Sequence, residues 1–287
     1  MTYRTLVPGH PDPTGALLVL SSADVYGIVD FAGGLLSRHI HHTAVTFFGQ
    51  LGGLLLACAA ALLMPADAVH TADLLWGALS GVGSAFAMRF LNRGLSRGAM
   101  TVVVPVSAVT GVALSVLCGV LVLGDRPGTL AWFGIAVTVP SLWFVSGGRA
   151  GAGKGTADGL LASAGVAVQY LALGQAGPES GLWPVAAGRV AAVLVLLPDA
   201  ARHVRRLKLP SARRVQALLI GAGAALGLVL YLLAAQQQLL AVAVVLASLY
   251  PALPVVLGLA LLHERISHRQ VMGLLGAGVA TVLLTLG

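Results

Sequence analysis

Four ionisable side chains lie inside otherwise apolar segments of this chain: Asp24, Asp30, Arg89 and Arg189. A charge at the centre of a membrane-spanning helix costs at least about 2.5–3.5 kcal/mol, and such side chains usually face a water-filled path or a partner inside the helical bundle. Four positions of this kind in one chain are therefore the first candidates for binding or moving a polar molecule.

Asp30 is the strongest of these candidates because of its neighbours on the helix. Tyr26, Gly27 and Gly34 are three or four residues away, so they share its helical face. The glycines would let another helix approach, while the carboxylate and the phenol face a cavity. We expect Asp30 to line this cavity and either to exchange a proton or to pair with Arg189 in one state. The alternative is a structural hydrogen bond between helices.

The other three ionisable groups have different expected roles. Asp24 points about 120° away from the face of Asp30, at about 100° per residue, and with Ser21 and Ser22 beside it we favour a structural role. Arg189 either binds an anionic group or extends to the membrane surface. For Arg89, which is near a helix end, extension to the surface is the expectation.

Uncharged polar side chains also lie deep in the apolar segments. Each one alone is more often a hydrogen-bonding contact between helices, worth about 0.6 kcal/mol. As a set they are suited to hydrogen-bonding a small substrate, and with Asp30, Tyr26 and Arg189 they make up the predicted cavity: Gln50, Gln169, Tyr170, Tyr231, Ser248 and Tyr250.

Metal and cofactor chemistry has little support in the residue pattern. His39, His41 and His42 share a short connection without a nearby acid or cysteine, and Cys58 and Cys118 are isolated in apolar blocks, so we predict no metal site. The segment GRAGAGKGT (148–156) has the spacing of a phosphate-binding loop but follows an apolar helix instead of a strand. No cofactor is therefore expected, and no grouping of nucleophile and base indicates an enzyme.

Composition places the chain in a lipid bilayer. Charged residues make up 9% and hydrophobic residues 57% of the chain, and its mean hydropathy is +0.92, whereas soluble domains carry about 25% charged residues. The net charge of +7 is spread over connections, where it sets membrane orientation. We therefore expect the bilayer as a partner and no nucleic acid.

Polar and Gly/Pro-rich points divide the chain into apolar blocks of the length that a bilayer core requires, about 20 residues. The predicted fold is an all-α membrane protein with ten transmembrane helices, at 16–36, 43–64, 72–92, 98–123, 129–147, 158–175, 182–198, 213–235, 239–262 and 268–286.

An internal repeat relates the two halves at an offset of 139 residues. VLCGVLVLGDRP (116–127) aligns with VVLGLALLHERI (255–266), and Gln50 and Asp30 align with Arg189 and Gln169. Because the unit holds five helices, an odd number, its second copy must cross the membrane in the opposite sense, as in many secondary transporters. We predict repeats at 1–147 and 159–287, joined by a Gly-rich linker at 148–158.

Several of these motifs together resemble the EamA family of the drug/metabolite transporter superfamily. They are YGIVDFAGGLLSR (26–38), the LGDRP and HERIS helix ends, SLYP (248–251) and the five-plus-five repeat. The resemblance implies a ten-helix bundle in the cytoplasmic membrane that moves small metabolites or drugs, typically outwards, by alternating access. One departure is Gln50, where relatives often carry Arg.

Two observations disagree about the side of the membrane on which the termini lie. Lys and Arg concentrate in the odd-numbered connections, which the positive-inside rule assigns to the cytoplasm, with both termini outside. The family resemblance suggests cytoplasmic termini. A misassigned first helix, which would leave nine spans and a cytoplasmic N-terminus, would reconcile the two indications. The leading functional prediction is a secondary exporter in the cell membrane, with proton coupling as one option. A membrane-embedded enzyme acting on lipid-linked substrates and a non-transporting partner protein are the alternatives, and the oligomeric state stays open.

Overall fold

The computed structural model describes residues 13–123, 126, 128–146, 155–235 and 251–286. The first half contains α1 (Pro13–His39), α2 (His42–Leu63), α3 (Thr71–Leu95), α4 (Met100–Cys118), the π-helical turn η1 (Gly119–Leu123) and α5 (Thr129–Val145). The second half contains α6 (Thr156–Gly174), the 3₁₀ turn η2 (Pro178–Ser180), α7 (Trp183–Arg202), α8 (Val204–Leu207), α9 (Ser211–Ala235), α11 (Ala252–Leu261) and α12 (His268–Leu286).

The described part of the chain is helical throughout, and every predicted apolar block contains a helix, although block 239–262 is described only from residue 251. α6 begins at Thr156, inside the predicted linker 148–158. Among the described helices, six are long and apolar enough to cross a membrane, and α5 and α11 are shorter apolar helices. The all-α membrane fold is thus confirmed, while the count of ten spans stays a prediction.

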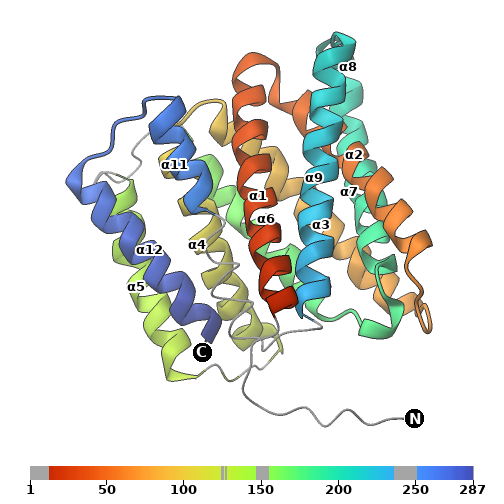
Figure 1. Cartoon of the computed structure of the whole chain (residues 1–287), viewed down its shortest axis with the longest axis horizontal. Helices are drawn as coiled ribbons and strands as arrows, with labels where there is room; N and C mark the ends of the chain where they lie inside the picture. Colours follow the sequence, from red (N-terminus) through yellow and green to blue (C-terminus); the bar gives the residue numbers. More distant parts are fainter. Residues whose placement is uncertain (1–12, 124–125, 127, 147–154, 236–250, 287) are drawn as a thin grey trace.

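α1 covers the first predicted apolar block. It is a continuous helix of 27 residues, about 40 Å long at 1.5 Å per residue. Figure 1 shows it running alongside α9 within the bundle, and it packs against α9, α11 and α3. The first predicted block is therefore a helix of membrane-crossing length.

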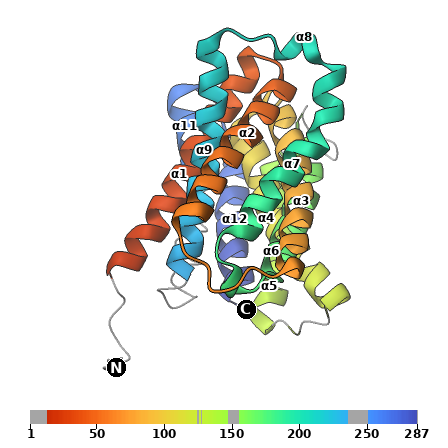
Figure 2. The same cartoon turned by 90° about the vertical axis from the view of Figure 1, so that its right-hand side faces the viewer.

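One end of the bundle collects most of the positive charge. We call it the basic end: α1, α3 and α7 end there, and α2, α4 and α9 begin there, with α8 at its edge (Figures 1 and 2). α11 also ends and α12 begins at this end, and apart from Arg126 and Arg189 every described Lys and Arg lies in one of these helix ends or in a connection between them. We refer to the other end as the opposite end.

Helix pairs from the two halves interleave. α3 packs on α6 and α7, and α9 packs on α1 and α2. Under the 139-residue offset, α1 corresponds to α6, α2 to α7 and α3 to α9, so these are equivalent pairs. α5 packs against α12, at one side of the bundle in Figure 1.

Glycines allow the closest of these approaches. A Cβ at Gly81 of α3 would overlap the carbonyl of Gly188 on α7, and one at Gly52 of α2 would overlap the carbonyl of Leu218 on α9. Small residues at this spacing let helix backbones touch. Gly77 and Gly81 of α3 both approach the backbone of α7 in this way.

Candidate functional site

A cavity of about 110 Å³ lies in the centre of the bundle, between helices of both halves. α1, α2, α3 and α4 contribute from the first half, and α6, α7 and α9 from the second. Its lining includes six of the nine predicted site residues: Tyr26, Asp30, Gln50, Gln169, Tyr170 and Arg189. Ser248, Tyr250 and the side chain of Tyr231 lie outside the described part of the chain.

Arg189 is fixed inside the bundle by two polar side chains. It is 7% exposed, and its Nη1 donates to Gln50 Oε1 at 2.8 Å and to Ser84 Oγ at 3.4 Å. Gln50 Nε2 also donates to Ser84 Oγ at 3.4 Å. The guanidinium therefore faces the interior and does not extend to the membrane surface.

The Gln50–Arg189 contact joins two equivalent positions of the repeat. The residues are 139 positions apart, the offset that aligns the two halves of the sequence. A residue and its counterpart can touch only close to an axis that relates the two copies. Asp30 and Gln169, the second such pair, line the same cavity.

Asp30 lies in this cavity without a partner for its carboxylate among the described residues. The predicted pairing with Arg189 is not present in this structure, where Arg189 binds Gln50 and Ser84. The neighbouring glycines do allow close helix contact, since Gly27 packs against Leu253 of α11. An unpaired carboxylate in such a place is costly unless it takes up a proton or binds a ligand.

Asp24 differs from the expectation of a structural role. Its side chain is exposed, and no hydrogen bond to it occurs within the described residues. Ser22 instead joins the helices here, because its Oγ donates to the Gly227 carbonyl of α9 at 2.7 Å. The small hydroxyl reaches the neighbouring backbone, whereas the Asp24 side chain is exposed.

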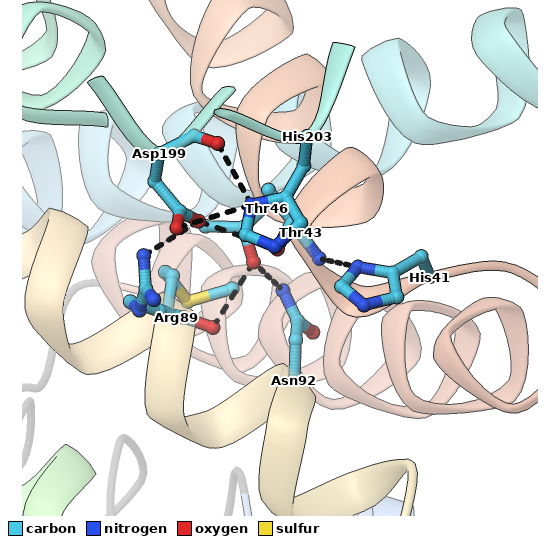
Figure 3. Close-up of polar contacts among 8 residues, drawn as sticks. His41, Thr43, Thr46, Arg89, Asn92, Asp199 and His203 are labelled. Carbon is cyan, nitrogen blue, oxygen red and sulfur yellow. Dashed lines mark hydrogen bonds and ion pairs between the residues drawn. The ribbon is translucent and has the colours of Figure 1, made fainter. Parts of the chain in front are cut away.

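Thr46 and Asn92 add polar groups to the cavity wall on the side of the basic end. Asn92 Nδ2 donates to Thr46 Oγ1 at 3.0 Å, and Thr46 Oγ1 donates to the Met88 carbonyl at 3.4 Å (Figure 3). Both side chains line the cavity. Neither residue was predicted from the sequence, although Ser80, Ser84 and Asn92 lie four and eight residues apart on α3 and so mark one polar helix face.

Asp199 joins three helices between the cavity and the basic end. Its Oδ2 forms an ion pair with Arg89 of α3 and accepts from Thr43 Oγ1 of α2 at 3.3 Å, and its Oδ1 lies 3.4 Å from His203 Nδ1 (Figure 3). Arg89 therefore does not simply extend to the membrane surface as expected. The proximity of Asp199, from the far end of α7, could not be read from the sequence.

His41 caps α2 beside this cluster. Its Nδ1 accepts the Thr43 N–H at 3.3 Å, and its ring stacks on those of His42 and His203, with centroids 4.4 and 5.6 Å apart. Burial and the positive charge of Arg206 lower the pKa of His41, which suits a neutral ring that accepts at Nδ1. No group of three metal-ligating side chains occurs in the described residues.

Glu264 forms a second junction at the basic end. Its Oε1 accepts from Arg38 Nη2 at 2.9 Å and from the Met100 N–H at 3.0 Å, and its Oε2 accepts from the Thr101 N–H at 3.0 Å. A carboxylate thus satisfies the free N–H groups at the start of α4. The junction therefore links Glu264, from the second half, to Arg38 and the start of α4 in the first half.

The charge of Glu264 is favoured in this junction. Burial by itself would raise the pKa of Glu264, but the hydrogen bonds from the Thr101 N–H, the Arg38 guanidinium and the Met100 N–H outweigh it. The pKa consequently lies below its ordinary value of 4.5.

Asp73 makes a comparable junction at the opposite end. Its Oδ1 accepts from the Gly177 N–H at 2.9 Å and its Oδ2 from Ser180 Oγ at 2.6 Å. Alongside, His70 Nε2 lies 3.2 Å from Glu179 Oε2. The start of α3, from the first half, is thereby tied to the connection between α6 and α7, from the second.

A smaller chamber of about 10 Å³ lies next to Arg189, on the side that faces the opposite end of the bundle. Ser84, Gln169 and Arg189 border both this chamber and the central cavity. The rest of its wall comes from the α3–α7 contact, with Gly81 and Gly188. The guanidinium and its partners therefore lie between the two spaces.

Comparison with known proteins identifies the family. The model of the EamA-like transporter family matches residues 13–147 and 159–286. The chain belongs to this family. The resemblance seen in its sequence motifs is thereby confirmed, and the two matches place one EamA-like unit in each half.

The solved structures support the fold of this EamA-like protein. One, described as the crystal structure of a protein, aligns over 95% of this chain and 96% of its own, with a TM-score of 0.59 and 14% identity. A sequence comparison with curated proteins finds no significant match. EamA membership and the apolar helices together identify a multi-pass membrane protein of a transporter family.

Proposed function

We propose that this EamA-like protein is a secondary transporter that exports a small polar metabolite or drug through the central cavity by alternating access. The observation that carries the proposal is the polar lining of that cavity, to which both halves contribute. Asp30 and Arg189 lie there, and neither forms an ion pair among the described residues. Charges held inside a membrane bundle in this way mark substrate and ion pathways.

The two EamA-like units are related by inversion, with the Gly-rich linker between them. The equivalent packing of α3 and α9 and the Gln50–Arg189 contact support this relation. Inverted repeats place the substrate site near the bilayer midplane, where the copies meet. The central cavity has that position between the halves.

Arg189 binds an anionic group of the substrate. Gln50 and Ser84 hold its Nη1, and a guanidinium binds carboxylate or phosphate with several donors at once. Relatives often carry Arg at the position of Gln50, whereas Gln50 is neutral. The Arg189 guanidinium therefore has a hydrogen-bonding partner here that adds no second positive charge.

Asp30 carries the coupling proton. Its carboxylate lies in the cavity wall, where a proton, a substrate cation or the Arg189 guanidinium could neutralise it. Since Arg189 is held by Gln50 and Ser84 in this state, protonation is the simplest neutral form. The group can then be charged in one state of the cycle and neutral in another.

Polar junctions tie helices together at both ends of the bundle. Glu264 and Asp199 tie helices together at the basic end, and Asp73 does so at the opposite end. During alternating access, the contacts at one end of the bundle would break while those at the other end stay formed. By the positive-inside rule the basic end faces the cytoplasm of a cell membrane.

A growth-resistance screen tests the proposal. Strains overexpressing the wild type or Arg189→Gln are grown with amino acids, nucleosides, aromatic compounds and cations at toxic levels. We expect at least one compound class against which only the wild type protects, with less compound inside the cells. Equal protection by both strains against every such class would contradict the role of Arg189, and accumulation of a modified compound would indicate an enzyme instead.

A further inference from the structure

A dense group of positive side chains lies between α7 and α9 at the basic end. The group, here called the basic patch, has six members: Arg202, Arg205, Arg206, Lys208, Arg213 and Arg214. Only Arg213 is half-buried, and the other five are exposed. The stretch from residue 202 to residue 214 contains no acidic residue.

The described carboxylates at this end are already paired with other arginines. Asp199 pairs with Arg89, Glu264 with Arg38, and Asp158 with Arg93 and Arg97.

The basic patch itself has only neutral partners within the described chain. Arg213 donates to Gln216, and Arg214 donates to the Leu209 carbonyl and lies over the Phe48 ring. Its positive charge is therefore not balanced by the part of the chain that the structure describes.

The basic patch cannot move far from the membrane surface. α7 and α9 are both long and apolar enough to span a bilayer, and only residues 203–210 connect them. Even fully extended, no residue of this connection lies more than about 14 Å from a helix end. Arginine side chains at that height reach the lipid headgroups.

Apolar side chains accompany the charges. Val204 of α8 and Val215 in the second turn of α9 are 55% and 50% exposed. Cations beside exposed apolar groups are typical of segments that lie in the headgroup region of a bilayer. This favours a lipid over a soluble anionic protein as the partner.

We infer that the basic patch binds anionic phospholipid headgroups of the leaflet around the basic end. Each Lys or Arg near a membrane surface contributes about 1 kcal/mol, or about fivefold, to the affinity for anionic lipid. Six uncompensated cations therefore suffice to select phosphatidylglycerol over the zwitterionic phosphatidylcholine. This binding does not depend on the transported substrate.

Native mass spectrometry of the purified full chain tests the inference. The protein is equilibrated with equal amounts of phosphatidylglycerol and phosphatidylcholine, and the retained lipids are counted. We expect the wild type to retain phosphatidylglycerol preferentially, and Arg205→Gln/Arg206→Gln to weaken this binding about 30-fold. Both side chains are exposed, so the variant should remain folded.

A matched variant at the same end controls for charge in general. Arg265→Gln/Arg269→Gln also removes two exposed positive charges, and we expect it to stay within about threefold of the wild type because it leaves the basic patch complete. An equal loss in both variants, or a wild type without preference for phosphatidylglycerol, would overturn the inference. So would preferential capture of an acidic peptide over the lipid.

Discussion

At the scale of single residues, the proposed substrate binding depends most on Arg189. It is buried, held by two neutral partners and placed between the central cavity and the smaller chamber. A charge-assisted hydrogen bond contributes about 1.5–3 kcal/mol. We therefore expect Arg189→Gln to weaken binding of an anionic substrate by roughly 10- to 100-fold, as measured by the ligand-induced shift in Tm.

Ser84→Ala is the matched variant for this prediction. It removes the weaker contact, at 3.4 Å, and leaves the Gln50–Arg189 contact at 2.8 Å. We expect less than a tenfold loss of affinity. If Ser84→Ala weakened binding as much as Arg189→Gln does, the guanidinium would not be the binding group.

Glu264 gives a pH-dependent prediction. Because its pKa in the folded protein is below its ordinary 4.5, its charge stabilises the fold above about pH 4.5, and this stabilisation is lost as the pH falls through the folded value. We expect Glu264→Gln to lower Tm at pH 7, with the difference from the wild type shrinking under acidic conditions.

Glu179→Gln is the control for the Glu264 prediction. The Glu179 side chain is 64% exposed and contacts only His70 among the described residues. Pairs as exposed as this contribute little, so we expect the Tm of this variant to follow that of the wild type from pH 4 to pH 7. A constant gap between Glu264→Gln and the wild type over that range would contradict the ionised junction.

How far the site could be predicted differs between residues. The free-energy cost of a charge inside a membrane helix and the helical spacing identified Asp30, Arg189 and the uncharged polar side chains. Both can be judged from the local sequence. The choice of partners was not predictable: Arg189 binds Gln50 in place of Asp30, and Glu264 binds Arg38 from the other half of the chain. Partner choice depends on how helices from the two halves are placed, which no local pattern contains.

At the scale of helices, glycine seams determine which pairs pack closely. A Cβ at Gly81 would overlap the backbone of Gly188, and the α3–α7 contact would have to widen. Overpacking of this kind costs about 1–3 kcal/mol. We expect Gly81→Ala to reduce the free energy of unfolding in mixed micelles by about that amount.

A second glycine serves as the control for the seam. A Cβ at Gly278 of α12 would meet nothing within 4 Å, so Gly278→Ala should be neutral or stabilising by up to about 1 kcal/mol. Equal effects of the two substitutions would mean that the α3–α7 seam is not tightly packed.

Helix positions were largely predictable from the apolar blocks, and their ends were less so. α6 begins earlier than predicted, at Thr156, and α8 was not predicted. Asp158, in the first turn of α6, pairs with Arg93 and Arg97 of α3. Such contacts between distant segments stabilise helix ends that hydropathy alone does not define.

At the scale of the whole molecule, the proposed alternating access requires the polar junctions at the two ends of the bundle to open one after the other. His70 and Glu179 face each other at the opposite end, 3.2 Å apart. In a chain whose native cysteines Cys58 and Cys118 are replaced by Ala, a His70→Cys/Glu179→Cys pair can be cross-linked by a short thiol reagent. We expect the cross-link to abolish turnover and reduction to restore it, and turnover that continues with the link intact would rule out opening at this point.

The central claim is that Asp30 carries a proton while Arg189 binds the substrate in the same cavity. Proteoliposomes containing wild type, Asp30→Asn or Arg189→Gln are tested for pH-driven uptake and for counterflow of a compound identified by the resistance screen. The account predicts both activities for the wild type, counterflow without pH-driven uptake for Asp30→Asn, and neither for Arg189→Gln. Unchanged pH-driven uptake by Asp30→Asn would contradict it.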